Sequence, residues 1–477
     1  MANTKKQPPN KALQKEYLQR KFSVHNGFFF KEHTLLTQLN TFLSTVFSAK
    51  NRVNPHIVVG FSGGLDSCAL LHLLAQLRQT LPFQLSAHHV HHGLSQHADA
   101  WADFCASTCN KLNIPLFISK VDVDINSGLG IEASARKVRY AVLLSSDADF
   151  ICTAHHQDDQ AETLLLQLAR GAGVKGLAGM AAVDEARKLL RPLLNISRAE
   201  LEAYAQVHKL SWVEDDSNTN TQFDRNFMRH TLLPTFMQQY RAIKQTLART
   251  AQHLANANNL LDVLAEQDAQ ACLSADLGKK TLALAPLKPL DLNRINNVLR
   301  WWLAQNNVLM PSAAQLQQIT QQLLNAKSDA AIKIQLKAEI DLTLRRYQDF
   351  AYLVPEMASN PKIDEIWQGE AICALPNQTQ LTFKQQLGAG LSLKLLDNKQ
   401  LLIKNRAGGE RIKPDLNRPS RSLKTVLQNA AIPPWQRSQL PLIFVGDTLA
   451  MIPNIAVEAS LKAAADEMGL VVTWQHL

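Results

Sequence analysis

The sequence lacks long apolar runs and paired cysteines, and each absence excludes a class of protein. No run of about 18 apolar residues occurs, so no segment is suited to cross a membrane as a helix. The six cysteines are scattered and include no C-x-x-C pair, which argues against a disulfide framework. We therefore expect a cytoplasmic protein with reduced thiols and no membrane partner.

The glycine-containing segment at 62–67 matches neither of two familiar phosphate-binding signatures, and the chain shows no secretory signal. The segment has neither the G-x-x-x-x-G-K-[ST] nor the G-x-G-x-x-G spacing, which disfavours a kinase, a GTPase or a dehydrogenase. The first 21 residues hold six basic residues but no apolar core, so residues 1–30 are predicted to be a flexible basic extension. The whole chain of 477 residues carries a net charge of +9, which favours a polyanionic partner, nucleic acid before membrane.

Apolar runs and helix-like segments alternate through the first third of the chain. The runs at 56–61, 83–90, 115–123 and 149–154 are predicted strands, and helices are expected at 66–79, 97–111, 131–146 and 158–170. Such alternation indicates βαβ units, and therefore an α/β fold with a parallel sheet covered by helices on both faces. Ligands of such sheets bind beyond the carboxyl ends of the strands.

The loop after the first predicted strand is the strongest single signal. Adjacent glycines at a strand-to-helix turn let main-chain N–H groups converge on an anion in front of the helix. The carboxylate of Asp66 is suited to hold Mg²⁺ or to take a proton. Because no P-loop lysine is present, the loop suits reaction at the α-phosphate of ATP. The candidate ATP-binding residues are Ser62, Gly63, Gly64, Leu65, Asp66 and Ser67.

Polar residues also follow the other predicted strands. Asp158, Asp159 and Glu162 begin a helix after the fourth strand, and the last two share a helix face. Capping explains one acid there but not three, so we expect a pocket for an ammonium group or for Mg²⁺. A transition-metal cluster is the alternative, and its candidate ligands are His91, His92, His155, His156 and Asp158.

The remainder of the chain divides by composition. We expect a catalytic domain at 31–235, a mainly helical middle domain at 236–355, a linker region at 356–385 and a basic α+β domain at 386–477. Arg225 and Arg229 are four residues apart and either reach phosphates or pair with nearby acids. The stretch from 391 to 437 contains ten Lys or Arg and three acidic residues, a composition that suits an RNA-binding surface or a solvated basic face.

These motifs together resemble one family. The segment at 62–67 resembles the S-G-G-x-D-S PP-loop of N-type ATP pyrophosphatases. The ordered set that follows is similar to tRNA(Ile)-lysidine synthase in its long form. That set comprises 88–94, Glu132 to Tyr140, 153–163, 191–194, Asp216 to Arg229, 406–411, Lys424 and 433–437. The resemblance covers nearly all of the chain beyond residue 50.

The resemblance implies a ligase. ATP would activate the C2 oxygen of the wobble cytidine, position 34, of a CAU-anticodon tRNA(Ile). L-lysine would then attack C2, AMP would leave, and the lysidine formed would read AUA instead of AUG. By the same resemblance Asp66, Asp159, Glu162 and Arg136 are catalytic, and Asp159 and Glu162 hold the lysine ammonium. Asp66 would position Mg²⁺ or help deprotonate the incoming amine. The implied tRNA contacts are Arg225, Arg229, Arg406, Arg411, Lys424 and Arg437.

Three other functions remain open from the residues. A PP-loop tRNA thiolase acting on cytidine is disfavoured because its typical C-x-x-C pairs are absent. A metal-dependent hydrolase would use the histidine and aspartate cluster, and a non-catalytic RNA-binding protein would bind tRNA without releasing AMP. The sequence leaves the oligomeric state open, a homodimer included.

Overall fold

A computed structural model describes the chain in two compact units, Met1–Val263 and Leu264–Leu477. The described residues are 34–124, 130–215, 221–273, 278–325, 332–338, 342–356, 361–376, 379–397 and 399–476. The predicted extension at 1–30 and the motif residues Asp216 to Asn218 lie outside them. Among the described residues, no helix is long and apolar enough to cross a membrane. All six cysteines are free and buried.

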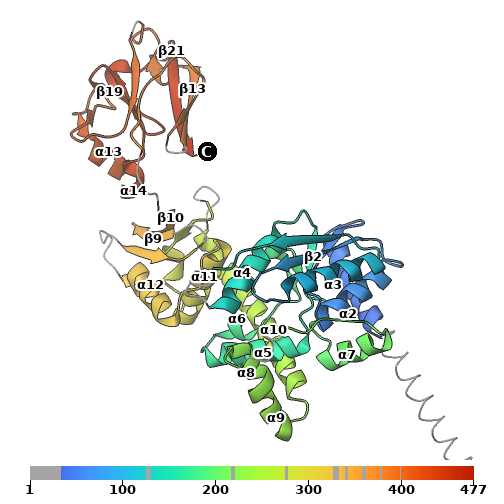
Figure 1. The fold of residues 1–477 in the computed structure, drawn as a ribbon. Helices are drawn as coiled ribbons and strands as arrows, with labels where there is room; N and C mark the ends of the chain where they lie inside the picture. The colour runs from blue at the N-terminus through green and yellow to red at the C-terminus, as the bar shows by residue number, and fades with distance from the viewer. Residues whose placement is uncertain are drawn as a thin grey trace, which may run out of the picture. The chain divides into compact units, whose positions relative to one another are not determined.

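The N-terminal unit is built on a mostly parallel six-stranded sheet of order β3-β2-β1-β4-β6-β5 (Figure 1). Only the edge strand β5 runs antiparallel, to β6. This sheet confirms the predicted α/β fold. The strands are β1 His56–Gly60, β2 Gln84–His91, β3 Leu116–Lys120, β4 Phe150–Cys152, β5 Val183–Asp184 and β6 Leu189–Leu190.

Helices cover both faces of this sheet because its central strands are apolar on both sides. Ile57 and Val59 of β1 pack in one core cluster together with residues of α2 and α3, whereas Val58 packs in a second cluster with Tyr140 and Leu143 of α4. Alternate side chains of a strand point to opposite faces, so β1 is buried from both directions. The helices are α2 Leu65–Leu77, α3 Ala98–Lys111, α4 Ile131–Leu144 and α5 Gln157–Ala169.

Shorter helices follow the sheet and lead to one long helix. The Ser197 hydroxyl accepts a hydrogen bond from the Glu200 N–H, the Glu200 side chain bonds back to the Ser197 N–H, and this capping box begins α7. A π-helical turn at Met228–Leu232 interrupts the next helical stretch. The remaining helices are α6 Val174–Leu177, α7 Arg198–Val207, α8 Asp224–Phe227, α9 Leu233–Gln239 and α10 Ile243–Ala269.

The region at 236–355, which is predicted to be mainly helical, contains more helix than strand among its described residues. Besides α11 Leu292–Gln305 and α12 Ala313–Asn325, this region carries a four-stranded antiparallel sheet of order β7-β10-β9-β8. The sheet and the helices share a core that contains Trp302, Leu299 and Leu344. The strands are β7 Thr281–Ala283, β8 Lys333–Leu336, β9 Leu342–Tyr347 and β10 Phe350–Pro355.

The prediction of a linker region at 356–385 is wrong in part. Strands β11 Asp364–Ile366, β12 Ile372–Leu375 and β13 Thr379–Leu387 lie within this stretch. β13 pairs with β21 Met468–His476 along nine residues, so the C-terminal domain begins before residue 386. Its other elements are β14 Leu391–Ser392, β15 Leu401–Lys404, β16 Arg411–Ile412, β17 Arg421–Ser422, α13 Leu423–Asn429, α14 Pro434–Arg437, β18 Leu442–Val445, β19 Thr448–Ile452 and β20 Ala456–Val457.

Candidate active site

The loop at 62–67 connects β1 to the N-terminus of α2, at the carboxyl edge of the sheet. Gly63 has a φ of +84°, and a Cβ atom there would lie 3.1 Å from both the Cys105 Sγ and a Val213 methyl group. The Gly63 carbonyl accepts a hydrogen bond from the Val213 N–H at 2.9 Å. Neighbouring chain therefore closes around this glycine, and a side chain would displace the loop.

The two serines of the loop meet in front of α2. Their Oγ atoms lie 3.1 Å apart, and the Ser67 hydroxyl donates to the Gly64 carbonyl at 3.0 Å. Gly64 is the N-cap of α2 and makes no side-chain capping bond, so it leaves the first N–H groups of the helix open to a ligand. Hydroxyl groups and a helix N-terminus at one point form a phosphate site.

His156 connects the 62–67 loop to the acids after β4. Its Nε2 atom lies 3.5 Å from the Asp66 Oδ2 and 3.6 Å from the Asp159 Oδ2. His156 is also the N-cap of α5. Its ring Nδ1 accepts a hydrogen bond from the backbone N–H of Asp159, and its backbone N–H donates to the Asp159 carboxylate. A single imidazole thus fixes the distance between the two predicted catalytic aspartates.

The charges of this group stabilise one another. Burial lowers the pKa of His156, but the carboxylates of Asp159 and Asp66 outweigh burial, so the pKa lies above its ordinary value. Burial raises the pKa of Asp159, yet the interaction with His156 and the positive charge of Arg225 leave it well below the ordinary range. Asp159 is therefore ionised at neutral pH.

Asp159 and Glu162 bind two arginine side chains. Arg225 donates from Nε to the Glu162 carboxylate and from Nη2 to Asp159, both at 2.8 Å. Arg229 donates from Nε to Glu162 at 2.6 Å and from Nη2 to Asp159 at 3.3 Å. The side chains of Glu162 and Asp159 are only 1% and 10% exposed. These four residues, which we call the acid–arginine cluster, form a buried network of alternating charges.

The cluster changes how Arg225 and Arg229 are interpreted. The sequence left two roles open for them, contact with phosphate or pairing with nearby acids. In the structure both guanidinium groups face the acids. The hydrogen bonds that they donate to Asp159 and Glu162 come from Nε and Nη2 and not from Nη1. Both side chains therefore belong to the same site as Asp159 and Glu162.

Two residues that position the site carry no recognisable sequence signal. The Nζ of Lys244, in α10, lies 2.6 Å from the Asp158 carboxylate. The same carboxylate accepts the Arg198 N–H at 3.1 Å, and the Arg198 side chain lies 4.0 Å from Asp66. Lys244 is 86 residues from Asp158 in the chain, so neither spacing nor motif relates them.

Several histidines of β2 and of the segment after β4 make hydrogen bonds, whereas the buried Nδ1 of His92 has no hydrogen-bond partner among the described residues. His89 bonds to the Phe61 carbonyl, His91 to Asp99 and His155 to the Thr153 hydroxyl. Burial lowers the pKa of His155 to about 3, so its ring is neutral. Among the described residues, no three His, Cys, Asp or Glu side chains are arranged to hold a metal ion by themselves. A protein-only metal cluster therefore has no support here.

Asp66 is suited to a cation that is held jointly with a ligand. Its Oδ1 atom is buried and accepts no hydrogen bond from the described residues. A carboxylate oxygen that accepts no hydrogen bond, at the N-terminus of a phosphate-binding helix, suits Mg²⁺, which usually takes one or two carboxylates plus substrate phosphates. Arg136, also predicted to be catalytic, lies on α4 with its guanidinium 5.4 Å from the centre of the Tyr140 ring.

The predicted RNA contacts of the C-terminal domain differ in exposure. Arg411 and Lys424 are exposed, and the Arg411 side chain bonds to Ser420. Arg406 is half-buried and lies 3.7 Å from Glu410. Arg437 is buried and donates to the Ile432 carbonyl, which does not fit a direct contact with RNA.

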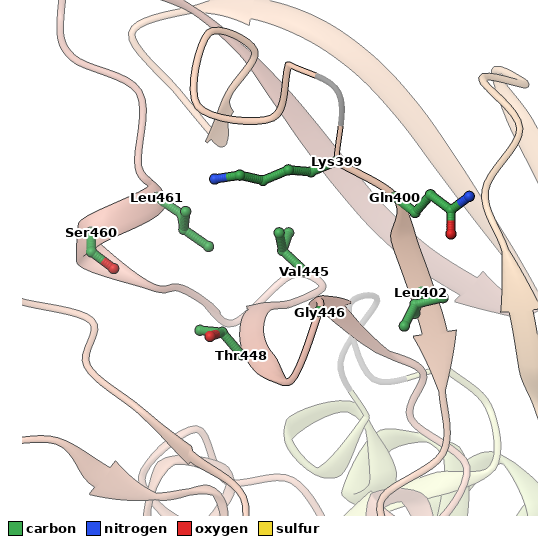
Figure 2. A pocket seen from close by; sticks show the side chains of 8 residues that line it. All are labelled: Lys399, Gln400, Leu402, Val445, Gly446, Thr448, Ser460 and Leu461. Atoms are coloured by element: carbon green, nitrogen blue, oxygen red, sulfur yellow. The ribbon is translucent and has the colours of Figure 1, made fainter.

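A separate hollow of about 680 Å³ lies in the C-terminal domain (Figure 2). Lys399 extends across it toward Ser460 and Leu461, and Thr448 and Leu402 line other parts of the wall. The lining contains one cation and no acid, so it lacks a group that would act as a base. The candidate chemistry therefore belongs to the N-terminal site.

Family models match three parts of the chain. A PP-loop domain matches residues 32–236, a TilS substrate-binding domain matches 282–352 and a TilS substrate C-terminal domain matches 401–474. The order of the three matches follows the order of the structural domains.

Curated relatives match over nearly their full length. The chain is 40% identical to the tRNA(Ile)-lysidine synthase of Nitrosomonas europaea, over 89% of this chain and 93% of that protein. It is 40% identical to the enzyme of the same name from Serratia proteamaculans, over 91% and 99%. A solved U34-tRNA thiolase of Methanococcus maripaludis is 18% identical, covers 47% of this chain and 79% of its own, and has a TM-score of 0.39, too low to carry an argument.

We predict that Gly63→Ala disables the 62–67 loop, whereas Gly93→Ala is a matched control. Both glycines have positive φ, +84° and +66°, so alanine is strained by about 1–2 kcal/mol at either site. Only at Gly63 would the added methyl group meet neighbouring atoms; at Gly93 nothing lies within 4 Å. The melting temperature and the rate of ATP-dependent AMP release should both fall further in Gly63→Ala than in Gly93→Ala. Equal losses in the two variants would contradict the close packing described for Gly63.

Proposed function

The chain belongs to the tRNA(Ile)-lysidine synthase family, and from that premise we propose that it converts the wobble cytidine of CAU-anticodon tRNA(Ile) to lysidine. In this reaction ATP and L-lysine are consumed, and AMP and pyrophosphate are released. The observation that carries the proposal is the contact of His156 with both Asp66 and Asp159. It joins a phosphate-binding loop and a pocket for an amino acid into one site.

The 62–67 loop serves the first half of the reaction. The hydroxyls of Ser62 and Ser67 and the N-terminus of α2 would bind the phosphates of ATP. The cytidine C2 oxygen attacks the α-phosphorus, the bond to the β-phosphate oxygen breaks, and pyrophosphate leaves. The loop has no lysine that would reach a γ-phosphate, which agrees with attack at the α-phosphate.

Mg²⁺ is proposed as the partner of ATP in this step. Asp66 would hold it through Oδ1, which accepts no hydrogen bond from the described residues, and the remaining ligands would be phosphate oxygens and water. The bound ion would neutralise charge on the leaving pyrophosphate. His156 and Arg198 keep the Asp66 side chain in place beside the loop.

The acid–arginine cluster is proposed as the pocket for the head of free L-lysine. An ionised carboxylate offers about four acceptor positions, and Asp159 and Glu162 each accept three hydrogen bonds from the described residues. Each therefore retains room for a donor, which suits the α-ammonium group. The Nη1 groups of Arg225 and Arg229 are directed at neither acid and suit the α-carboxylate.

This orientation leaves the ε-amine free for the second half of the reaction. The amine must lose a proton before it attacks C2, and Asp66 is the base that we propose. A C–N bond forms at C2, the C2–O bond to the adenylate breaks, and AMP leaves. Arg136 would stabilise the phosphate of the departing AMP or the adenylated base.

Binding of tRNA is proposed to involve the basic C-terminal domain through Arg406, Arg411 and Lys424. Cations of this kind bind the phosphate backbone and supply affinity rather than sequence selection. Since the substrate and ATP are cytoplasmic molecules, the proposed site of action is the cytoplasm. A homodimer, the assembly that the sequence leaves open, would appear as twice the chain mass of 53.1 kDa in sedimentation.

Other functions have less support. A thiolase would need a sulfur-carrying site, and the sequence contains no C-x-x-C pair. A metal-dependent hydrolase would need a ligand cluster, and the described residues supply none. A non-catalytic RNA-binding protein would not need Asp66, His156 and Asp159 held together.

We predict that the protein, ATP and Mg²⁺ together transfer radiolabelled L-lysine to a CAU-anticodon tRNA(Ile) transcript. Asp66→Ala should abolish AMP release and leave tRNA affinity intact, since Asp66 touches the reacting groups and not the RNA backbone. Scintillation counting, AMP chromatography and filter binding measure the three quantities. Absence of label in the wild-type reaction would overturn the function, and loss of both activities in Asp66→Ala would assign that residue to folding instead.

The proposed orientation of lysine predicts how analogues behave. Cadaverine, which lacks the α-carboxylate, should be used at least tenfold less efficiently than L-lysine, because it forfeits the charge-assisted bonds to Arg225 and Arg229. In Arg225→Met the preference for L-lysine over cadaverine should shrink. Competition assays of kcat/KM measure this ratio. An unchanged preference in the variant would place the carboxylate elsewhere.

A further inference from the structure

The segment at 225–261 has a one-sided charge composition, and the proposed chemistry uses only part of it. It contains no Asp or Glu and five Lys or Arg, namely Arg225, Arg229, Arg241, Lys244 and Arg249. Three of these pair with acids of α5, as described above. Arg241 and Arg249 are exposed, and no acid among the described residues forms an ion pair with either.

One face of this segment is fixed to the helix that carries the catalytic acids. Met228 and Leu233 are buried against Ala161 and Leu165 of α5, and Leu247 of α10 packs at the edge of the same cluster. Because α5 also carries Asp159 and Glu162, the hairpin formed by α9 and α10 is anchored directly on the active-site helix.

The opposite face is exposed and aromatic. Every residue from 234 to 242 is exposed, including Phe236 at 37% and Tyr240 at 63%. The Tyr240 N–H donates to the Phe236 carbonyl at 2.8 Å, so these residues are one helical turn apart and share a face. Arg241 follows directly in the turn to α10, and α9 lies at the outer end of the N-terminal unit (Figure 1).

We propose that the exposed face of the α9–α10 turn, formed by Phe236, Tyr240 and Arg241, binds unpaired nucleotides of the tRNA anticodon loop. The inference rests on the proposed function and adds to it the surface that holds the loop while one base enters the site. Bases stack on the two aromatic rings, and the guanidinium of Arg241 binds a loop phosphate.

Charge and chemistry favour an RNA loop over a protein as the occupant. Three of the five cations pair with acids of α5, so the exposed part of the segment carries Arg241 and Arg249 and no acid, a charge that suits the phosphates of RNA. A base that is splayed out of a loop leaves its neighbours unstacked, and exposed aromatic side chains replace that stacking without reading sequence. The face also belongs to the segment that places Arg225 and Arg229 in the site.

The experiment is binding of a fluorescently labelled CAU anticodon stem-loop RNA to the full-length protein, followed by anisotropy. Tyr240→Ala should weaken binding about tenfold, because loss of one base–aromatic stack is of that order. Tyr240→Trp should retain affinity. Phe117→Ala is the matched control, since Phe117 is 56% exposed on the edge strand β3 and should leave affinity unchanged.

Salt dependence separates the two kinds of contact. Arg241→Ala should reduce the slope of log K against log salt concentration by about 0.7, the value for one phosphate contact on a single strand. Tyr240→Ala should lower affinity at every salt concentration and leave the slope unchanged. Melting curves check that each variant is folded.

The outcomes distinguish this inference from the proposed function. If the wild-type protein incorporates lysine but Tyr240→Ala and Arg241→Ala bind the stem-loop as tightly as Phe117→Ala, the docking surface is wrong and the function stands. If the wild-type protein binds the stem-loop through Tyr240 yet incorporates no lysine, the function is wrong and the surface stands. Equal weakening by all three variants overturns the inference, because it indicates a general loss of structure.

Discussion

The structure of the site depends on the buried ion pairs between Asp159, Glu162, Arg225 and Arg229. The carboxylates sit on α5 and the guanidiniums on α8 and the π-helical turn, so the pairs hold distant parts of the chain together. Removal of one partner from a buried pair leaves an uncompensated charge and typically costs about 3–5 kcal/mol. A purely apolar contact would hold these helices together without the desolvation free energy that buried charges cost, so the retained charges point to a polar ligand.

Contacts connect this cluster to two other parts of the N-terminal unit. His156 extends it to Asp66 and the phosphate-binding loop, and Lys244 extends it through Asp158 to α10. The π-helical turn places Arg229 beside Glu162, and such turns often occur at functional sites. The hydrophobic packing of Met228 and Leu233 on α5 anchors α9 to the helix that carries Asp159 and Glu162.

The sequence predicts the parallel sheet and the 62–67 loop well, because both depend on local patterns. The four strand ends fall within a few residues of their expected places, and Asp66, Asp159 and Glu162 all lie at the carboxyl edge. The link through His156 and the pairing of Lys244 with Asp158 depend on tertiary contacts that spacing does not encode. Within 356–385, β13 pairs with β21 about 90 residues further along the chain and β11 pairs with β15, and such distant pairings are not encoded in the local sequence pattern.

The central claim is that one site binds the ATP phosphates at the 62–67 loop and the head of L-lysine at the acid–arginine cluster. The most direct measurement is a crystal structure of the full-length protein with L-lysine and a non-hydrolysable ATP analogue. The account predicts the lysine α-ammonium against Asp159 and Glu162, the α-carboxylate against Arg225 and Arg229, and the ε-amine directed toward Asp66. Lysine bound outside the cluster, or with its ε-amine on Glu162, would contradict it.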